Sequence, residues 1–273
     1  MLPADPDAPA SSPAPLTPAT PSRALSFDGA AAQYAAARPG YPPALFDAVE
    51  ELARRPLRGA RVVDVGAGTG ISTRLLHERG ARVTAVEPGA GMAEELHRSL
   101  PHLPVVRGDG NHLPLATASA DLITYAQSWH WTDPALAAPE ALRDLRPGGA
   151  LVLWWNVSDH SVPWIAEQDA RLRRFFDTGD SAHGSPVRPR DLTSGLHFAH
   201  RRVPWSRRVS LDTHLANLGT HSAFLVLGAE PARGFLAEER DRLAELFPDG
   251  TVEERYVVDL GVAISPGPPS HAP

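Results

Sequence analysis

Apolar and polar positions alternate in segments through the middle of the chain, and this rhythm is the main indication of its fold. The short apolar runs that predict buried strands cover residues 61–65, 82–86, 105–107, 121–126 and 150–156. The segments with apolar residues at helical spacing cover residues 42–54, 72–79, 90–100 and 134–145. Strands that alternate with helices in this way predict right-handed crossovers, and so an α/β fold with a mostly parallel sheet and helices on both faces.

After residue 156 the rhythm changes. A helix is predicted over 163–176 and is followed by a polar stretch rich in glycine, proline and histidine, so we interpret residues 157–202 as a cap insertion after the fifth strand. A strand at 203–211, a helix at 238–246 and a final strand at 252–262 would then complete a seven-stranded sheet.

The two ends of the chain have no hydrophobic period. Residues 1–24 are almost entirely Pro, Ala, Ser, Thr and Asp, and residues 265–273 have a similar composition, so both are predicted to be disordered tails of one domain at 25–264. No segment resembles a secretory signal, and none approaches the ~20 apolar residues that span a bilayer. We therefore expect a cytoplasmic protein that does not enter a membrane.

The composition and net charge of the chain exclude several classes of partner and catalytic mechanism. The 273 residues are 42% apolar, enough for a sizeable core, and the formal net charge is −6, so we expect no nucleic-acid partner. Cysteine is absent, which excludes disulfides, thiolate metal sites and a cysteine nucleophile. All 26 basic residues are arginine, which excludes a lysine Schiff base. No spacing of residues predicts a metal site.

A glycine-rich turn follows the first predicted strand, where residues 62–70 read Val-Val-Asp-Val-Gly-Ala-Gly-Thr-Gly. Glycines at this point let the backbone turn sharply and approach a ligand, and the helix behind them suits an anionic group. The dinucleotide fingerprint fails, because its sixth position is Ile71 rather than glycine. The phosphate-binding P-loop pattern also fails, because it requires a lysine.

The acid–x–Gly–x–Gly–x–Gly pattern that starts at Asp64 resembles motif I of class I S-adenosylmethionine-dependent methyltransferases. The resemblance implies a Rossmann-like fold and S-adenosyl-L-methionine as the cofactor. It implies that Glu87, at the end of the second strand, binds the ribose, and that Asp109, after the third, binds the adenine. The other residues implied in cofactor binding are Asp64, Gly66, Ala67, Gly68, Gly110 and Gln127.

Residues 27–41 resemble the segment that precedes motif I in methyltransferases of the methyltransferase-11 type, including those similar to trans-aconitate methyltransferases. The resemblance implies that Tyr34 covers the cofactor and that Arg38 pairs with an anionic group, such as the methionine carboxylate or an acidic substrate. The alternative is that Tyr34 packs in a helix interface and Arg38 is solvated.

The loop after the fourth strand, at residues 126–133, would lie beneath the transferred methyl group in such a fold. His130 is the candidate catalytic base, because histidine titrates near neutral pH. Trp129 and Trp131 are candidates for the substrate pocket, where they could hold a sulfonium by cation–π attraction. The alternative is that His130 is structural and the two tryptophans pack against the sheet. His221, in a segment that resembles a late part of the same enzymes, is a further pocket candidate, or part of a plain turn.

These observations predict a methyltransferase that acts on a small organic acceptor. The 126–133 loop lacks the Asn/Asp-Pro-Pro-aromatic signature of enzymes that methylate planar amino groups, so oxygen or carboxylate acceptors are favoured over nitrogen or carbon. Two alternatives stay open, an NAD(P)-dependent oxidoreductase on a similar sheet and a non-catalytic S-adenosylmethionine-binding protein. The sequence does not determine the acceptor atom, the use of a general base, the role of 157–202 or the oligomeric state.

Overall fold

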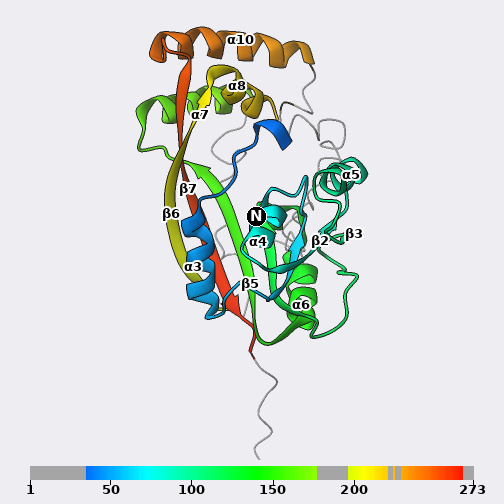
Figure 1. Ribbon diagram of the computed structural model, residues 1–273. Coiled ribbons are helices and arrows are strands. Elements are labelled where there is room, and N and C mark those ends of the chain that lie inside the picture. Colours follow the sequence, from blue (N-terminus) through cyan, green and yellow to red (C-terminus); the bar gives the residue numbers. More distant parts are fainter. Residues whose placement is uncertain (1–34, 177–195, 221–223, 225–228, 267–273) are drawn as a thin grey trace, which may run out of the picture.

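The computed structural model describes residues 35–176, 196–220, 224 and 229–266 of the chain (Figure 1). In this part of the chain seven strands form one sheet, in the order β3-β2-β1-β4-β5-β7-β6. The strands are β1 (Arg61–Val65), β2 (Arg82–Glu87), β3 (Val105–Arg107), β4 (Ala120–Ala126), β5 (Leu145–Ser158), β6 (Ala199–Ser210) and β7 (Thr251–Ile264).

The sheet is mostly parallel, as predicted, but it is mixed, because its last two strands pair in antiparallel register. The pairs from β3 through β5 are all parallel, as the alternation with helices predicts, but β5 pairs with β7 and β7 with β6 in antiparallel register. These two pairings are the longest in the sheet, with Ser158 opposite Tyr256 and Ala199 opposite Val262. The direction of a strand depends on where the preceding helix ends in space, which the apolar pattern of the strand does not encode.

Helices cover both faces of the sheet, as predicted. The helices are α3 (Pro43–Ala53), α4 (Ile71–Glu78), α5 (Ala90–Ser99), α6 (Pro134–Asp144), α7 (Pro163–Phe175), α8 (Leu211–Gly219) and α10 (Ala229–Leu246), with a 3₁₀ turn, η2 (Trp129–Trp131). Side chains alternate along β1, so Val62 packs in a core beneath α3 and α4, while Val63 packs on the other face in a core with α6.

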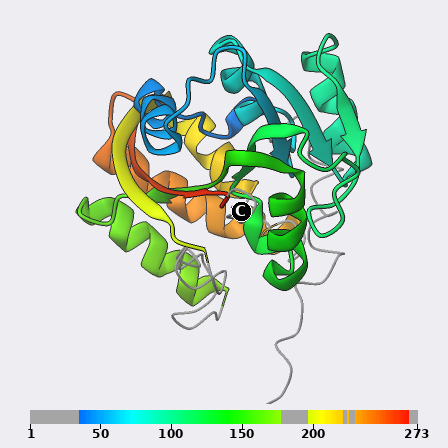
Figure 2. The ribbon, with the colours of Figure 1, turned by 90° about the horizontal axis from the view of Figure 1, so that it is seen from below.

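Helices α7, α8 and α10 gather at one end of the molecule, where β6 and β7 extend beyond the other strands (Figure 1). Seen along the other direction, β6 and β7 curve around the side of the sheet opposite β2 and β3 (Figure 2). Helix α8 was not predicted, and α10 begins nine residues before the predicted 238–246 helix. Short helices of mixed composition are stabilised by packing more than by their own propensity.

Several predicted boundaries change. Strand β5 runs to Ser158 and β6 starts at Ala199, so the ends of the 157–202 segment belong to strands, while 177–195 lie outside the described residues. Ser265 is buried and donates a 2.8 Å hydrogen bond to the Gly149 oxygen, so the carboxyl-terminal tail starts later than predicted. The predicted tail at 1–24 and residues 267–273 lie outside the described residues. None of the described helices combines the length and apolar character that a membrane crossing requires.

Candidate active site

The glycine turn between β1 and α4 has two glycines with different roles. Gly66 and Gly68 both adopt positive φ angles, of 65° and 58°. A Cβ atom on Gly66 would lie 2.5 Å from the Cβ atom of Ser128, so close packing against the end of β4 requires glycine there. A Cβ atom on Gly68 would meet no atom within 4 Å, so this residue faces open space. The turn therefore presents bare backbone at Gly68.

Glu87 ties this turn to the start of α5. Its side chain is 6% exposed at the end of β2, where one carboxylate oxygen accepts a 2.7 Å hydrogen bond from the Gly68 N–H. The other oxygen accepts a 2.7 Å bond from the Gly89 N–H. Each carboxylate oxygen can accept more than one hydrogen bond, so this geometry is compatible with additional hydroxyl donors.

Asp64 lies beneath the turn and does not reach its surface. It is fully buried and accepts hydrogen bonds of 2.8 Å from the hydroxyls of Thr73 on α4 and Thr124 on β4. Burial disfavours the charged form and raises the pKa of Asp64 to about 6. The side chain therefore joins α4 to the sheet, and the prediction that it contacts a cofactor directly is not supported by this placement.

Asp109 and Gly110 follow β3. Asp109 is exposed, and its Oδ1 accepts hydrogen bonds from the backbone N–H groups of Asn111 at 2.7 Å and His112 at 3.2 Å. Gly110 is buried, and a Cβ atom there would lie 2.7 Å from Thr132. Asp64 and Glu87 thus lie near the ends of β1 and β2, and Asp109 follows β3, so the three carboxylates occupy successive strand ends; the first two are buried and Asp109 is exposed.

A small cleft separates the glycine turn from the segment before α3. It brings together three stretches that are distant in sequence, and its lining consists of Arg38, Pro39, Tyr41, Gly66, Ala67, Gly68, Thr69, Ile71, Ser72, Ala126 and Gln127. The cleft is small, with a volume of about 50 Å³, and it lies beside the open face of Gly68.

Gln127 and Tyr41 meet across this cleft. The Gln127 side chain donates a 3.2 Å hydrogen bond to the Tyr41 hydroxyl, and the Gln127 backbone has a φ of 56°, which is uncommon for a residue with a side chain. Such backbone strain concentrates at functional sites. The prediction named Gln127 but not Tyr41, although the Arg-Pro-Gly-Tyr spacing from Arg38 could have indicated it.

The side chains of the η2 turn point to different surroundings. Trp129 is fully buried and packs edge-on against Tyr125 at 4.7 Å between ring centroids, which is the packing alternative; its place in a substrate pocket stays a prediction. His130 is exposed, and its Nδ1 accepts a 3.4 Å hydrogen bond from the indole N–H of Trp155. Trp131 is half-buried, and the centroid of its ring lies 4.6 Å from that of His130 with the two rings tilted by 46°.

The packing around His130 affects its protonation. Although the residue is exposed, desolvation by the protein atoms around the ring lowers the pKa of His130 to about 4. The imidazole is therefore neutral at physiological pH, and its Nδ1 is occupied by Trp155. The two remaining candidates, Tyr34 and His221, lie outside the described residues.

Comparison with known proteins agrees with the Rossmann-like arrangement. Residues 63–153 match the family model described as "Methyltransferase domain". An uncharacterised methyltransferase of Mycobacterium tuberculosis is 42% identical over 166 residues, which cover 61% of this chain and 63% of that protein. The aligned part of the chain thus spans less than two thirds of this relative.

Solved structures extend the similarity to most of the chain. A candidate type II methyltransferase from Anaeromyxobacter dehalogenans aligns with a TM-score of 0.65 at 25% identity, over 85% of this chain and 99% of that one. The phosphoethanolamine N-methyltransferase 2 of Haemonchus contortus, solved with S-adenosyl-L-methionine, aligns with a TM-score of 0.50 over 89% of this chain and 60% of that one. Its identity of 13% supports a shared fold alone.

Proposed function

From the premise that residues 63–153 carry a domain of the methyltransferase family, we propose that this chain is a class I enzyme that transfers a methyl group from S-adenosyl-L-methionine to a small organic acceptor. The observation that carries the proposal is the contact between Glu87 and Gly68. The carboxylate of Glu87 at the tip of β2 accepts a hydrogen bond from the Gly68 N–H, and the space where a side chain on Gly68 would lie is open.

The residues present fit the cofactor. The bare backbone at Gly68 leaves room for its methionine portion, with Gly66, Ala67 and Gln127 beside it and Arg38 as the partner of its carboxylate. Glu87 would accept hydrogen bonds from the ribose hydroxyls, and Asp109 from the adenine amino group. When bound, the cofactor supplies an electrophilic methyl group on a sulfonium, whose departure leaves a neutral thioether.

Because the leaving group is neutral, the protein needs to align the acceptor and exclude water rather than supply an acid. We propose that α7, α8 and α10 form a cap for the acceptor, since they gather where β6 and β7 extend past the sheet (Figure 1). His130, neutral at physiological pH, would accept a proton through Nε2 only for acceptors that lose one. An oxygen or carboxylate acceptor remains our preferred class.

An oxidoreductase is the second candidate, and Ile71 at the sixth position of the turn argues against it. Calorimetric titration of the full chain with S-adenosylmethionine, S-adenosylhomocysteine and NAD distinguishes the two. We expect binding of the first two ligands and none of NAD. Binding of NAD alone would overturn the proposal. Release of S-adenosylhomocysteine with a panel of carboxylic acids, phenols and amines then tests catalysis, and a protein that binds the cofactor but turns over no acceptor would be a binding protein only.

A further inference from the structure

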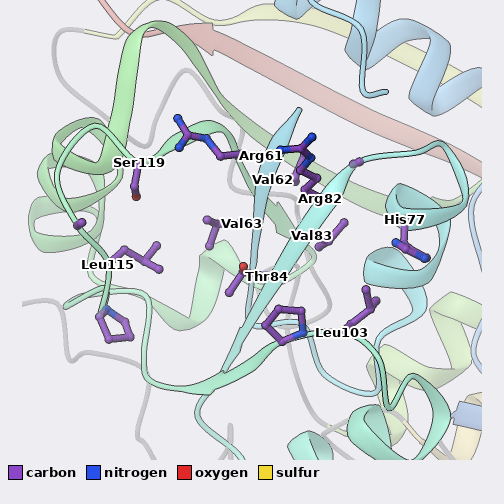
Figure 3. Close-up of a pocket in the computed structure, with 14 residues that line it drawn as sticks. Arg61, Val62, Val63, His77, Arg82, Val83, Thr84, Leu103, Leu115 and Ser119 are labelled. Carbon is purple, nitrogen blue, oxygen red and sulfur yellow. The ribbon is translucent and has the colours of Figure 1, made fainter. Parts of the chain in front are cut away.

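A hollow larger than the cleft at the glycine turn lies elsewhere in the described part of the molecule. Its volume is about 570 Å³, and it is formed at the amino ends of β1 and β2, whereas the glycine turn follows the carboxyl end of β1 (Figure 3). The hollow exists because β3 is short: it pairs with β2 only from Ala85 to Glu87, so residues 82–84 of β2 have no β3 residue in register. Hollows of 300–1,000 Å³ are typical of small-molecule sites.

Positive charge is concentrated at one end of this hollow. Arg61 and Arg82 line it and are partners in the register of β1 and β2, an arrangement in which like charges repel. The nearby carboxylate of Asp121 is shared, because it contacts Arg55 at 3.2 Å, Arg146 at 3.4 Å and Arg61 at 3.9 Å. Three guanidinium groups around one carboxylate leave a net positive charge.

The Arg61 side chain lines the hollow and is 39% exposed, so its guanidinium can reach an anion there. Ser119 lines the same end and adds a hydroxyl (Figure 3).

Most of the remaining lining is apolar, with His77 and Thr84 as its polar side chains. Val63 and Leu115 lie below the two arginines on the side of Ser119, and Leu103 lies on the opposite side, near His77 (Figure 3). A ligand that matches both ends has an anionic head and an apolar body. We propose that this hollow binds a small amphipathic anion, a carboxylate or phosphate monoester on an alkyl or aromatic body, at a site separate from the glycine turn.

The proposal is tested by calorimetric titration of the full chain with octanoate and octyl phosphate, with octanol as the neutral control. We expect 1:1 binding of at least one anion and none of octanol. Shortening the acid to butanoate should weaken binding by about fourfold for each methylene that no longer contacts the apolar wall. Preference for octyl phosphate over octanoate would identify a phosphate headgroup, and the reverse a carboxylate.

Substitutions separate this hollow from other positive surfaces. Arg82→Gln and Arg61→Gln should each weaken binding about three- to fivefold, as expected for partly exposed charges, and the double variant at least tenfold. Arg208→Gln, on the exposed β6 at the other edge of the sheet, should bind like the wild type. If Arg61→Gln fails to fold, Arg82→Gln, at an exposed position, is sufficient for the test.

Equal affinity in wild type and Arg82→Gln, absence of binding, or displacement of the anion by S-adenosylhomocysteine at the glycine turn would each overturn the proposal. Its outcome does not depend on the proposed methyltransferase activity.

Discussion

The guanidinium of Arg207 on β6 donates a 2.8 Å hydrogen bond to the backbone oxygen of Ala37, directly before Arg38. The same guanidinium bonds the buried carboxylate of Glu254 on β7 at 2.5 Å. Arg38 in turn donates to the backbone oxygen of Thr220, directly after α8, at 3.1 Å. The segment that covers the glycine turn is thus fastened to the carboxyl-terminal strands and to α8.

Substitution of Arg207 should therefore loosen the cover of the cleft. Arg207→Lys keeps the charge near Glu254 but cannot hold both partners with one planar group. We expect affinity for S-adenosylmethionine to fall about fivefold, with a smaller change in kcat. Arg208→Lys, at the adjacent exposed position, is the matched control. Calorimetry and steady-state kinetics check this, and identical affinities in the two variants would show that Arg207 does not position the segment.

Glu87→Gln tests the proposed ribose contact directly. Replacing the carboxylate weakens charge-assisted hydrogen bonds, so cofactor binding should lose about 2 kcal/mol, close to thirtyfold in affinity. The exposed Glu78→Gln on α4 is the control, for which no change is expected. If titration calorimetry finds the Glu87 variant as tight as wild type, Glu87 is not part of the site.

Gly66 and Gly68 form a matched pair for alanine substitution. Both require a left-handed backbone, which costs about 1–2 kcal/mol for alanine. Gly66→Ala also places its Cβ atom 2.5 Å from the Cβ atom of Ser128, which is a steric clash, so the thermal midpoint should fall further in this variant than in Gly68→Ala. Gly68→Ala places its methyl group in open space, so it should fold nearly as well and lose cofactor affinity instead. Thermal unfolding and calorimetry on both variants check this, and the reverse order of stabilities would contradict it.

Asp64 predicts a pH dependence of stability. Its pKa is about 6 in the folded protein against 3.8 for the unperturbed group, so the folded state binds the proton more tightly. This contribution to the free energy of unfolding is complete below about pH 4 and is lost as the pH rises through about 6. A shift of about two units corresponds to roughly 3 kcal/mol.

Asp64→Asn removes this titration while keeping the size of the side chain. Urea unfolding between pH 4 and 8 should show a smaller loss of stability with rising pH in the variant than in the wild type. Asp144, whose pKa is raised to about 6 by burial, titrates in both proteins and cancels from the comparison. Parallel stability curves would contradict the assignment to Asp64.

His130→Gln tests the candidate base. The ring is neutral above about pH 5, because burial lowers its pKa to about 4. We expect the variant to turn over more slowly, about tenfold or more, on an acceptor that loses a proton, with unchanged cofactor affinity. The wild-type profile of kcat against pH should show no His130 ionisation near 6.5. Unchanged turnover in the variant would assign His130 a packing role with Trp155.

The features that depend on local sequence were predictable. The five strands from Arg61 to Asn156 and the helices between them follow from apolar period and from breakers such as the glycines after Val65, because these act over a few residues. Glu87 could likewise be placed at a strand tip beside the turn. That position depends on the length of β2 and of the preceding helix alone.

The sequence alone did not reveal which groups meet across the fold. Trp129, His130 and Trp131 are consecutive, yet the first is buried in the core and the second accepts a hydrogen bond from Trp155. Asp64 matches the motif pattern, but its burial beneath the turn depends on α4 and β4, which supply its hydrogen-bond donors Thr73 and Thr124. The antiparallel direction of β6 and β7 also depends on the tertiary structure. The hydrogen bond from Arg207 to Ala37 joins residues that are 170 positions apart in the sequence. Burial and hydrogen-bond partners are properties of such distant pairs, so the tertiary structure decides them.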